Sequence, residues 1–344
     1  MKRTKILLTF LSACLLLFIH YPGAAQKAPA RLRYAFATGQ RVDIKQEETT
    51  NDFEENLVEG SKSESSTLKE IAQQWQVVGV TPGGESTIEV KYTWLQLRRR
   101  LQPGVVLTLD TRRSAAEVNP ILIQLGPQGV PILERFEMIR KLIMDVFVGR
   151  TYKMVVSDVG KVKSFSGFDQ AWEDYRLKVE KLIPDKGKRA ELDALIEAFF
   201  GEEAVHKLFS YSLFVSLPEE PAGVGHEWSD STDFSLQSIH LPIKRNYKLT
   251  SVSDTGKSFK IDGKVIFDPP TATEEVEFKI PGNTLTAEIS LDPANGTLLA
   301  QTYSGKLEFE AYGRQAPNNR RIIHLVSETS GRVLMTTGQP EDRP

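Results

Sequence analysis

Four stretches of this sequence alternate strictly between apolar and polar residues. Successive side chains of a β-strand point to opposite faces, so each stretch predicts a strand with one buried side and one solvent-facing side. One-sided burial is typical of antiparallel sheets, whereas the strands of buried parallel sheets are apolar throughout. The four stretches are residues 88–94, 275–280, 285–291 and 306–311.

The alternation changes phase once, directly after Trp94, where the apolar positions move to Leu95 and Leu97. Two adjacent apolar residues with a change of parity predict a β-bulge, which bends and twists the strand that contains it. We therefore expect strongly curved sheets rather than flat ones.

Short glycine-containing segments separate the predicted strands, and they predict tight turns because Gly, Asn and Asp tolerate positive φ. Two of these segments are identical at five of six positions, namely 156–161 and 252–257. The similarity fits convergent turn chemistry and equally a tandem pair of β units, and the sequence leaves both open. The remaining turns are predicted at residues 81–84 and 292–296.

The middle of the chain has a helical pattern. Residues 132–147 place apolar side chains three or four positions apart, which predicts an amphipathic helix. Residues 168–182 and 189–200 predict two more helices with a Pro-Gly break between them, and residues 202–209 predict a fourth. The predicted fold class is therefore α+β, mostly antiparallel β, with strongly curved sheets and a central helical insert.

The pattern divides the chain after residue 25 into consecutive parts. Residues 46–68 are dense in Glu, Asp, Ser, Thr and Asn, which fits a long polar β-ribbon or a disordered loop. The predicted parts are an N-terminal β-rich part (26–131), a helical segment with a β-hairpin at 150–164 (132–216), a C-terminal antiparallel β part (222–338) and a loose tail (339–344).

The first 25 residues have the order of a secretory signal peptide. A basic start precedes an apolar run from Ile6 to Ile19, and small residues follow before a polar start. This order predicts cleavage between Ala25 and Gln26, and hence a periplasmic or extracellular protein. The apolar run is shorter than the ~20 residues that cross a bilayer as a helix, so we expect no transmembrane span.

The single cysteine of the chain, Cys14, lies inside this segment. The residues before it also match a lipobox, in which Cys14 would be acylated and anchor the protein to a membrane. The apolar run continues past Cys14, which favours cleavage after Ala25. Both interpretations predict a folded part without a disulfide.

The charge balance excludes one class of partner. The chain has 43 basic and 45 acidic residues, a net charge of −2, and the predicted signal peptide removes three basic residues and no acidic ones. A nucleic-acid-binding protein usually has a basic excess, so we expect no nucleic-acid partner.

The segment Gly223–Asp230 is the most motif-like stretch for chemistry. His226 lies beside Glu227 and close to Asp230, a combination that can serve acid–base catalysis. In a strand, however, His226 and Trp228 would share one face and Glu227 would lie on the other. Trp228 would then fill the core, and the favoured interpretation is structural.

Two further groups of residues have a functional and a plainer interpretation. Glu202 and His206 would share a helix face, but a zinc site needs three or four such ligands, so an exposed pair is favoured. The run Arg98–Arg100, with Arg112 and Arg113, could bind an anion or form a solvated strand end. The chain contains no phosphate-binding loop, dinucleotide fingerprint or nucleophile elbow, so we predict no cofactor and no catalytic residue.

The order of several short motifs resembles a family of uncharacterised secreted bacterial β-rich proteins, classed as a domain of unknown function. The motifs are Leu32-Arg-Tyr34 before Gly39-Gln40, the strand 77–80 with its glycine-rich turn, the hairpin 156–161, and Val224-Gly-His-Glu-Trp228 before Tyr247. The resemblance implies a fold type and an exported location, and it implies no activity.

Three functions are consistent with these observations. The first is a non-enzymatic envelope or periplasmic protein that binds a partner or ligand, or has a structural role. The second is a periplasmic carrier that encloses a lipid or other apolar ligand in a curved β-sheet. The third is a hydrolase that uses His226.

Overall fold

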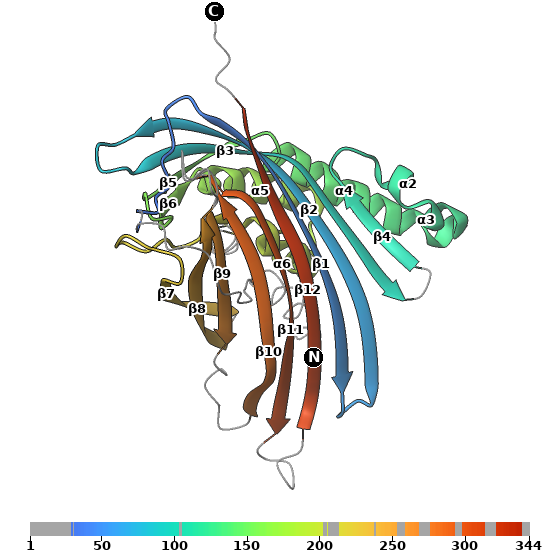
Figure 1. Ribbon diagram of the computed structural model, residues 1–344. Helices are drawn as coiled ribbons and strands as arrows, with labels where there is room; N and C mark the ends of the chain where they lie inside the picture. The colour runs from blue at the N-terminus through green and yellow to red at the C-terminus, as the bar shows by residue number, and fades with distance from the viewer. Residues whose placement is uncertain are drawn as a thin grey trace, which may run out of the picture.

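The computed structural model describes residues 29, 31–102, 105–201, 205, 213–236, 239–252, 259–267, 276–292, 298–313 and 321–338. Within these residues, twelve strands form one sheet (Figure 1). The strands are β1 (Arg41–Asn56), β2 (Ser61–Val80), β3 (Ser86–Gln102), β4 (Val105–Asp110), β5 (Thr151–Val156), β6 (Val162–Ser166), β7 (Glu227–Leu236), β8 (Ile239–Val252), β9 (Phe259–Phe267), β10 (Val276–Leu291), β11 (Leu298–Gly313) and β12 (Arg321–Gly338).

The order of the strands joins the two β-rich parts of the chain into one sheet. It runs β6-β5-β3-β2-β1-β12-β11-β10-β9-β8-β7, and β4 pairs with β3 beside this path. All of the described strand pairs are antiparallel. The central contact is the pairing of β1 with β12, which joins Arg41 to Gly338 and Asn56 to Ile323. The sheet is not closed, and the predicted mostly antiparallel class is confirmed.

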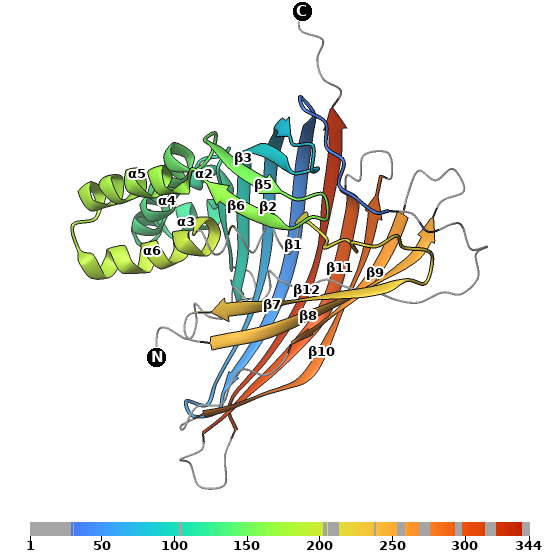
Figure 2. The ribbon, with the colours of Figure 1, turned by 90° about the vertical axis from the view of Figure 1, so that its left-hand side faces the viewer.

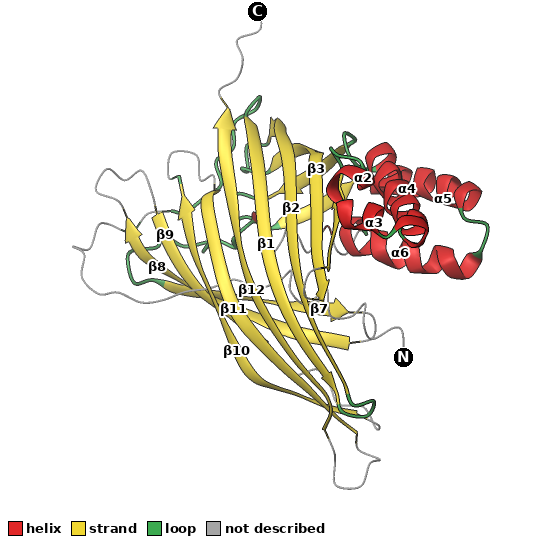
Figure 3. Cartoon of the chain, turned by 90° about the vertical axis from the view of Figure 1, so that its right-hand side faces the viewer, coloured by secondary structure: helices red, strands yellow, loops and turns green. Residues whose placement is uncertain are grey.

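The sheet is bent into a trough. Its concave face lies toward the viewer in Figure 2, where β7 and β8 run across the direction of β1 and β12, and its convex face is seen in Figure 3. Part of the bend comes from β3, where Ala72 pairs with Trp94 but Gln73 pairs with Tyr92, leaving Thr93 as an extra residue. This is the predicted bulge.

The long polar segment at residues 46–68 is a β-ribbon made by β1 and β2, so the ribbon interpretation is confirmed. The predicted hairpin around residues 156–161 joins β5 to β6, with the Ser157 amide donating to the Lys161 carbonyl at 2.9 Å. Gly160 has a φ of +82°, and a Cβ there would lie 2.5 Å from the Val215 carbonyl oxygen, so both conformation and space require glycine. The predicted turns at 252–257 and 292–296 lie mostly outside the described residues.

The helices lie together beside the β3–β5–β6 edge of the sheet (Figure 3). The three long ones were predicted, and they are confirmed, with ends that differ from the predicted bounds by at most three residues. The fourth predicted helix, 202–209, lies mostly outside the described residues. The helices are α2 (Ala115–Val118), α3 (Pro120–Gln124), the 3₁₀ turn η2 (Gly126–Gln128), α4 (Val130–Val146), α5 (Phe168–Leu182) and α6 (Lys186–Phe200).

The short helix α2 was not predicted, although the sequence carries a signal for it. The Ser114 side chain accepts from the Glu117 amide, and the Glu117 carboxylate accepts from the Ser114 amide at 2.7 Å. This reciprocal pair is a capping box, which a Ser followed three residues later by Glu indicates. Helices of four or five residues show too little periodicity for hydrophobic spacing to reveal them.

One end of the trough is filled by the chain itself. Residues 213–217, called here the inner segment, pass between β2 and β7. Phe214 stacks on Trp75 of β2 at 5.4 Å and meets Tyr34 edge-on at 5.3 Å. The Trp228 indole of β7 donates to the Ser216 carbonyl at 2.7 Å. The inner segment therefore connects both walls of the trough through aromatic side chains.

Candidate functional site

The concave face changes character along β1. Its inward positions are every second residue, and all of them from Val42 to Thr50 are buried. The first two, Val42 and Ile44, are apolar and belong to the main core. The next three are Gln46, Glu48 and Thr50. The inward side chains of β1 thus change from apolar at one end of the trough to polar in its middle, and they stay buried throughout.

Two glutamines of the polar middle lie in one row across the sheet. Gln46 of β1 pairs with Val333 of β12, which pairs with Gln301 of β11. Their exposed fractions are 2% and 1%. Among the described residues, neither the amide nitrogen nor the carbonyl oxygen of either side chain has a hydrogen-bond partner. Four buried polar atoms of two side chains are therefore unpaired.

The next row contains a buried acid held by a tyrosine. Glu48 pairs with Gly331, which pairs with Tyr303, and the Tyr303 hydroxyl donates to Glu48 Oε2 at 2.8 Å. A Cβ on residue 331 would overlap the Tyr303 ring, so only glycine lets the tyrosine cross β12. Burial raises the pKa of Glu48, although the charge of Lys69 and the Tyr303 hydrogen bond oppose this.

The polar middle extends over neighbouring strands. The Gln73 amide nitrogen and the Thr67 hydroxyl on β2 are buried without partners, while Ser327 donates to Asp52 at 2.7 Å. Burial raises the pKa of Asp52, against the hydrogen bond from Ser327 and the charge of Arg99. We call the buried set the polar floor; it comprises Gln46, Glu48, Thr50, Thr67, Gln73, Gln301, Tyr303, Ser327 and Thr329.

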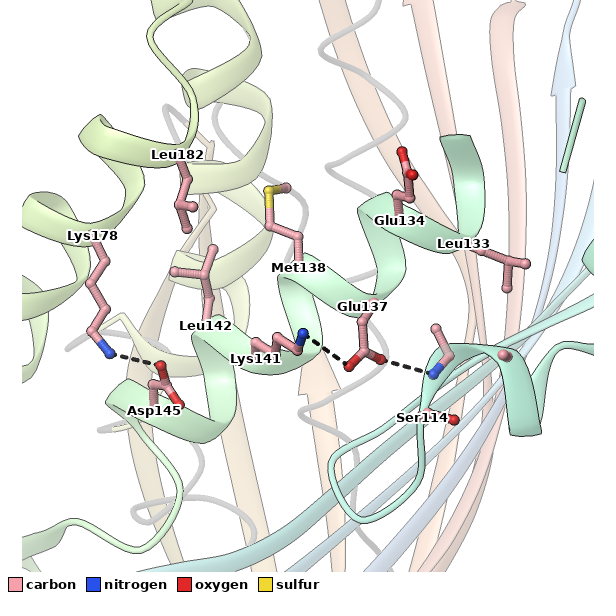
Figure 4. A pocket seen from close by; sticks show the side chains of 12 residues that line it. Ser114, Leu133, Glu134, Glu137, Met138, Lys141, Leu142, Asp145, Lys178 and Leu182 are labelled. Atoms are coloured by element: carbon pink, nitrogen blue, oxygen red, sulfur yellow. Dashed lines mark hydrogen bonds and ion pairs between the residues drawn. The ribbon is translucent and has the colours of Figure 1, made fainter. Parts of the chain in front are cut away.

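A second candidate site is a groove between α2, α4 and α5, with a volume of about 640 Å³ (Figure 4). Met138, Leu142 and Leu182 point into it. Four of the charged side chains that line it form ion pairs with one another: Lys178 with Asp145 at 2.8 Å, and Lys141 with Glu137 at 3.8 Å.

Glu137 also accepts hydrogen bonds from two other groups. It accepts from the Ala115 amide at 3.0 Å and from Arg140 at 2.6 Å, and chiefly the Arg140 hydrogen bond lowers its pKa to about 2. The paired charges of this groove thus hold the helices against one another.

Three possible metal ligands approach one another on the convex face, where Glu308, Glu310 and His324 place oxygen and nitrogen atoms within 4.8 Å. Glu310 already accepts from Arg321 at 2.5 Å and from Tyr312 at 2.7 Å, and His324 lies 2.9 Å from Glu308. Burial raises the pKa of Glu310, but the hydrogen bonds from Arg321 and Tyr312, together with the charges of Arg321 and His324, lower it overall. A metal ion would have to compete with the Arg321 guanidinium, so the group is better described as an ion-pair network.

The residues singled out for acid–base chemistry lie at the start of β7. His226 is half-buried and stacks on Trp228 with ring centroids 6.0 Å apart. Asp230 accepts two hydrogen bonds from Arg245, at 2.6 and 2.5 Å, and Glu227 accepts from Lys248 at 2.6 Å. Both carboxylates are thus neutralised by cations, and the catalytic use of His226 stays a prediction.

The remaining sequence candidates are separated or outside the described residues. Cys14, Ala25, Gln26, Glu202 and His206 lie outside them.

The arginine run does not form one cluster. Arg98 and Arg100 are exposed, while Arg99 between them lies on the opposite face of β3, where its charge acts to lower the pKa of Asp52. Arg112 covers the Trp94 ring at 5.1 Å. Sequence reasoning missed the polar floor, whose only local signal is that the inward alternation of residues 42–50 continues with polar side chains.

Residues 134–298 match the model of a family described as "Family of unknown function (DUF6263)", which confirms the resemblance to a domain of unknown function. No curated protein matches the chain. No helix among the described residues is long and apolar enough to cross a membrane.

Among solved structures, the chain is similar to lipovitellin, in a structure of lipid–protein interactions, with 8% identity and a TM-score of 0.45. The match covers 90% of this chain and 26% of the lipovitellin chain, so this chain spans about a quarter of that length. It also matches DynF of the dynemicin biosynthesis pathway of Micromonospora chersina, with 6% identity, a TM-score of 0.19, and coverage of 97% of this chain and 100% of that one. An outer membrane channel from Pseudomonas putida F1 matches with 7% identity, a TM-score of 0.18, and coverage of 92% and 100%.

Proposed function

We propose that the protein is an exported, non-enzymatic binding protein whose ligand lies on the polar floor of the trough. The observation that carries the proposal is the pair Gln46 and Gln301, each buried with both polar side-chain atoms unpaired. A ligand that hydrogen-bonds to these atoms supplies the missing partners.

Buried polar groups without partners destabilise a folded protein. A buried donor or acceptor without a partner costs about 1–3 kcal/mol, and native proteins pair the large majority of such groups. Apolar side chains would remove that cost entirely, as Val333 does between the two glutamines. Glutamines at these positions therefore reduce the stability of the empty protein and favour a bound state.

A second candidate function is the carrier of a lipid or another apolar molecule. The observation that favours it is the composition of the same row of the sheet. On one side of the glutamines lie Ile71 and Leu95, and on the other lie Ile289 and Ile261, all buried. A small polar centre within an apolar surface is typical of pockets that orient mainly apolar ligands.

The exported location rests on the N-terminal segment, with its basic start, apolar run and small residues before Gln26. Mass spectrometry of the protein from its own cells tests it. A mature N-terminus at Gln26 supports free release, whereas an acylated N-terminal Cys14 supports the lipid-anchored alternative. An intact Met1 contradicts both.

Native mass spectrometry of the same preparation tests the binding function. We expect a bound mass on the wild-type protein that is lost from the double variant Gln46→Leu, Gln301→Leu. The matched control is Gln74→Leu, which changes an exposed glutamine of β2 on the convex face. A bound mass unaffected by the double variant, or a wild-type protein that carries none, would contradict the proposal.

A further inference from the structure

We infer that the ligand of the polar floor carries a secondary amide, which bridges Gln46 and Gln301 above Val333. The inference rests on the proposed binding function and adds the chemistry of the group that is bound. The observations behind it are the register of β1, β12 and β11 and the unpaired polar atoms of the Gln46 and Gln301 side chains.

The distance between Gln46 and Gln301 suits a bridging amide. Gln46 and Gln301 both lie in register with Val333, one on each side of β12. Neighbouring strands are about 4.8 Å apart, so the two glutamine Cα atoms are roughly 10 Å apart. A trans amide with a hydrogen bond at each end spans about 8 Å, and its N–H and C=O point in opposite directions. Such a group above β12 can meet one glutamine on each side.

The unpaired atoms of the two glutamines are of two kinds. Each carboxamide offers a free N–H₂ donor and a free C=O acceptor. An anion would satisfy only the donors, and a cation only the acceptors. A ligand amide satisfies one donor and one acceptor at once, and this holds for either orientation of each glutamine carboxamide.

The two substituents of the amide would lie in different surroundings. The two substituents of a bridging amide leave it along β12. One direction leads to Met335 and Ile44, which are apolar. The other leads to Gly331, where the Tyr303 ring crosses β12 and its hydroxyl donates to the Glu48 carboxylate. The amide therefore separates an apolar from a polar substituent, which describes an N-acylated polar molecule.

Calorimetry on the full mature protein with a matched pair of probes tests the inference. The probes are N-dodecanoylethanolamine and its ester counterpart 2-hydroxyethyl dodecanoate, which differ by one N–H replaced by oxygen. Loss of that hydrogen bond leaves a glutamine carbonyl unpaired, so we expect the amide to bind at least about tenfold more tightly than the ester. The preference should disappear in Gln46→Leu, Gln301→Leu and persist in Gln74→Leu.

The outcomes separate this inference from the binding function. Equal affinities for amide and ester, both lost in the double variant, would overturn the amide and leave the binding function in place. Binding of neither probe, together with a retained natural ligand that fragmentation shows to lack an amide, would also overturn it.

A second probe pair identifies the source of the amide. N-dodecanoylserine represents an acylated amino acid and N-dodecanoylglucosamine an acylated amino sugar. Tighter binding of either one than of the ester supports the inference and identifies the polar head group. Binding of both no tighter than the ester contradicts it.

Discussion

The two ends of the concave face differ in how they satisfy buried groups. At the end next to the inner segment, the protein fills its own trough: Val215 donates to the Tyr34 hydroxyl at 2.9 Å, and Phe214 packs on Trp75. In the middle, Gln46 and Gln301 are equally buried, but their side chains have no hydrogen-bond partner in the part of the chain that the structure describes. The two regions are equally buried but affect the stability of the fold in opposite directions. The contacts of the aromatic end stabilise it, whereas the unpaired polar atoms of the middle destabilise it.

This contrast separates a region that packing explains from the region to which we assign the proposed binding function. At the aromatic end the Tyr34 hydroxyl and the Val215 amide are paired with each other, and the Trp75 indole donates to the Gln73 carbonyl oxygen. Packing and these hydrogen bonds explain why the aromatic side chains lie there. Packing does not explain the buried carboxamides of Gln46 and Gln301, because apolar side chains at these two positions would fill the same space without leaving polar atoms unpaired. The convex face offers the control, because its charged side chains pair with each other across strands, as Glu47 does with Arg332 at 2.8 Å.

The largest effect is expected from breaking the filled end. Phe214→Ala removes a buried ring that contacts Trp75, Tyr34 and Phe36, and should lower the free energy of unfolding by about 3–5 kcal/mol. Chemical denaturation measures this. The control Leu182→Ala changes an exposed side chain of the helix groove and should cost under about 1 kcal/mol. Similar losses in both variants would mean that the inner segment contributes little.

The opposite sign is expected in the polar middle. Gln46→Leu with Gln301→Leu removes four unpaired buried atoms and should raise the free energy of unfolding of the ligand-free protein by about 1–3 kcal/mol. Denaturation after removal of ligand measures the change. Gln74→Leu should leave stability within about 0.5 kcal/mol. A destabilised double variant would show that the glutamines have structural partners.

A third change tests the crossing of Tyr303 over β12. In Gly331→Ala the new methyl group overlaps the tyrosine ring and approaches the Glu47 carbonyl at 2.7 Å, so a loss of about 1–3 kcal/mol is expected. Adding Tyr303→Leu should recover part of this loss, because a shorter side chain leaves room for the methyl group. If the double variant recovers no stability, the clash is with the Glu47 backbone carbonyl rather than with the Tyr303 ring.

The smallest effect concerns pH. Because burial raises the pKa of Glu48 above its usual 4.5, the folded state holds that proton more tightly than the unfolded state. Stability from this group is complete below pH 4.5 and falls as pH rises through the folded pKa. Glu48→Gln removes this dependence, so its stability relative to wild type should increase from pH 4.5 upward. A difference that is constant with pH would contradict the raised pKa.

Local pattern predicted much of the fold. Helices α4, α5 and α6 have enough turns for their apolar spacing to be recognised, and the change of parity after Trp94 marked the bulge in β3. The Gly-containing turn at 156–161 was recognised for the same reason, since a positive φ restricts the residue type. Each of these features depends on residues within one element.

The polar floor depends on residues that are far apart in the chain. Gln46 and Gln301 become neighbours of Val333 only because β1 pairs with β12 and β12 with β11. Alternation tells which side chains share a face of a strand, but it does not tell which strand lies beside it. It also does not show that Gln46 is buried as deeply as Ile44.

The amino-acid sequence by itself determined the class of fold, the alternating faces of the strands, the long helices and the export signal that we propose. These follow from periodicity and turn chemistry, which act over a few residues. Only the tertiary structure decided which faces meet, because strand order and register follow from the packing of the whole chain. The candidate site belongs to this second group, since it consists of buried polar atoms whose missing partners become apparent only when every neighbour is in place.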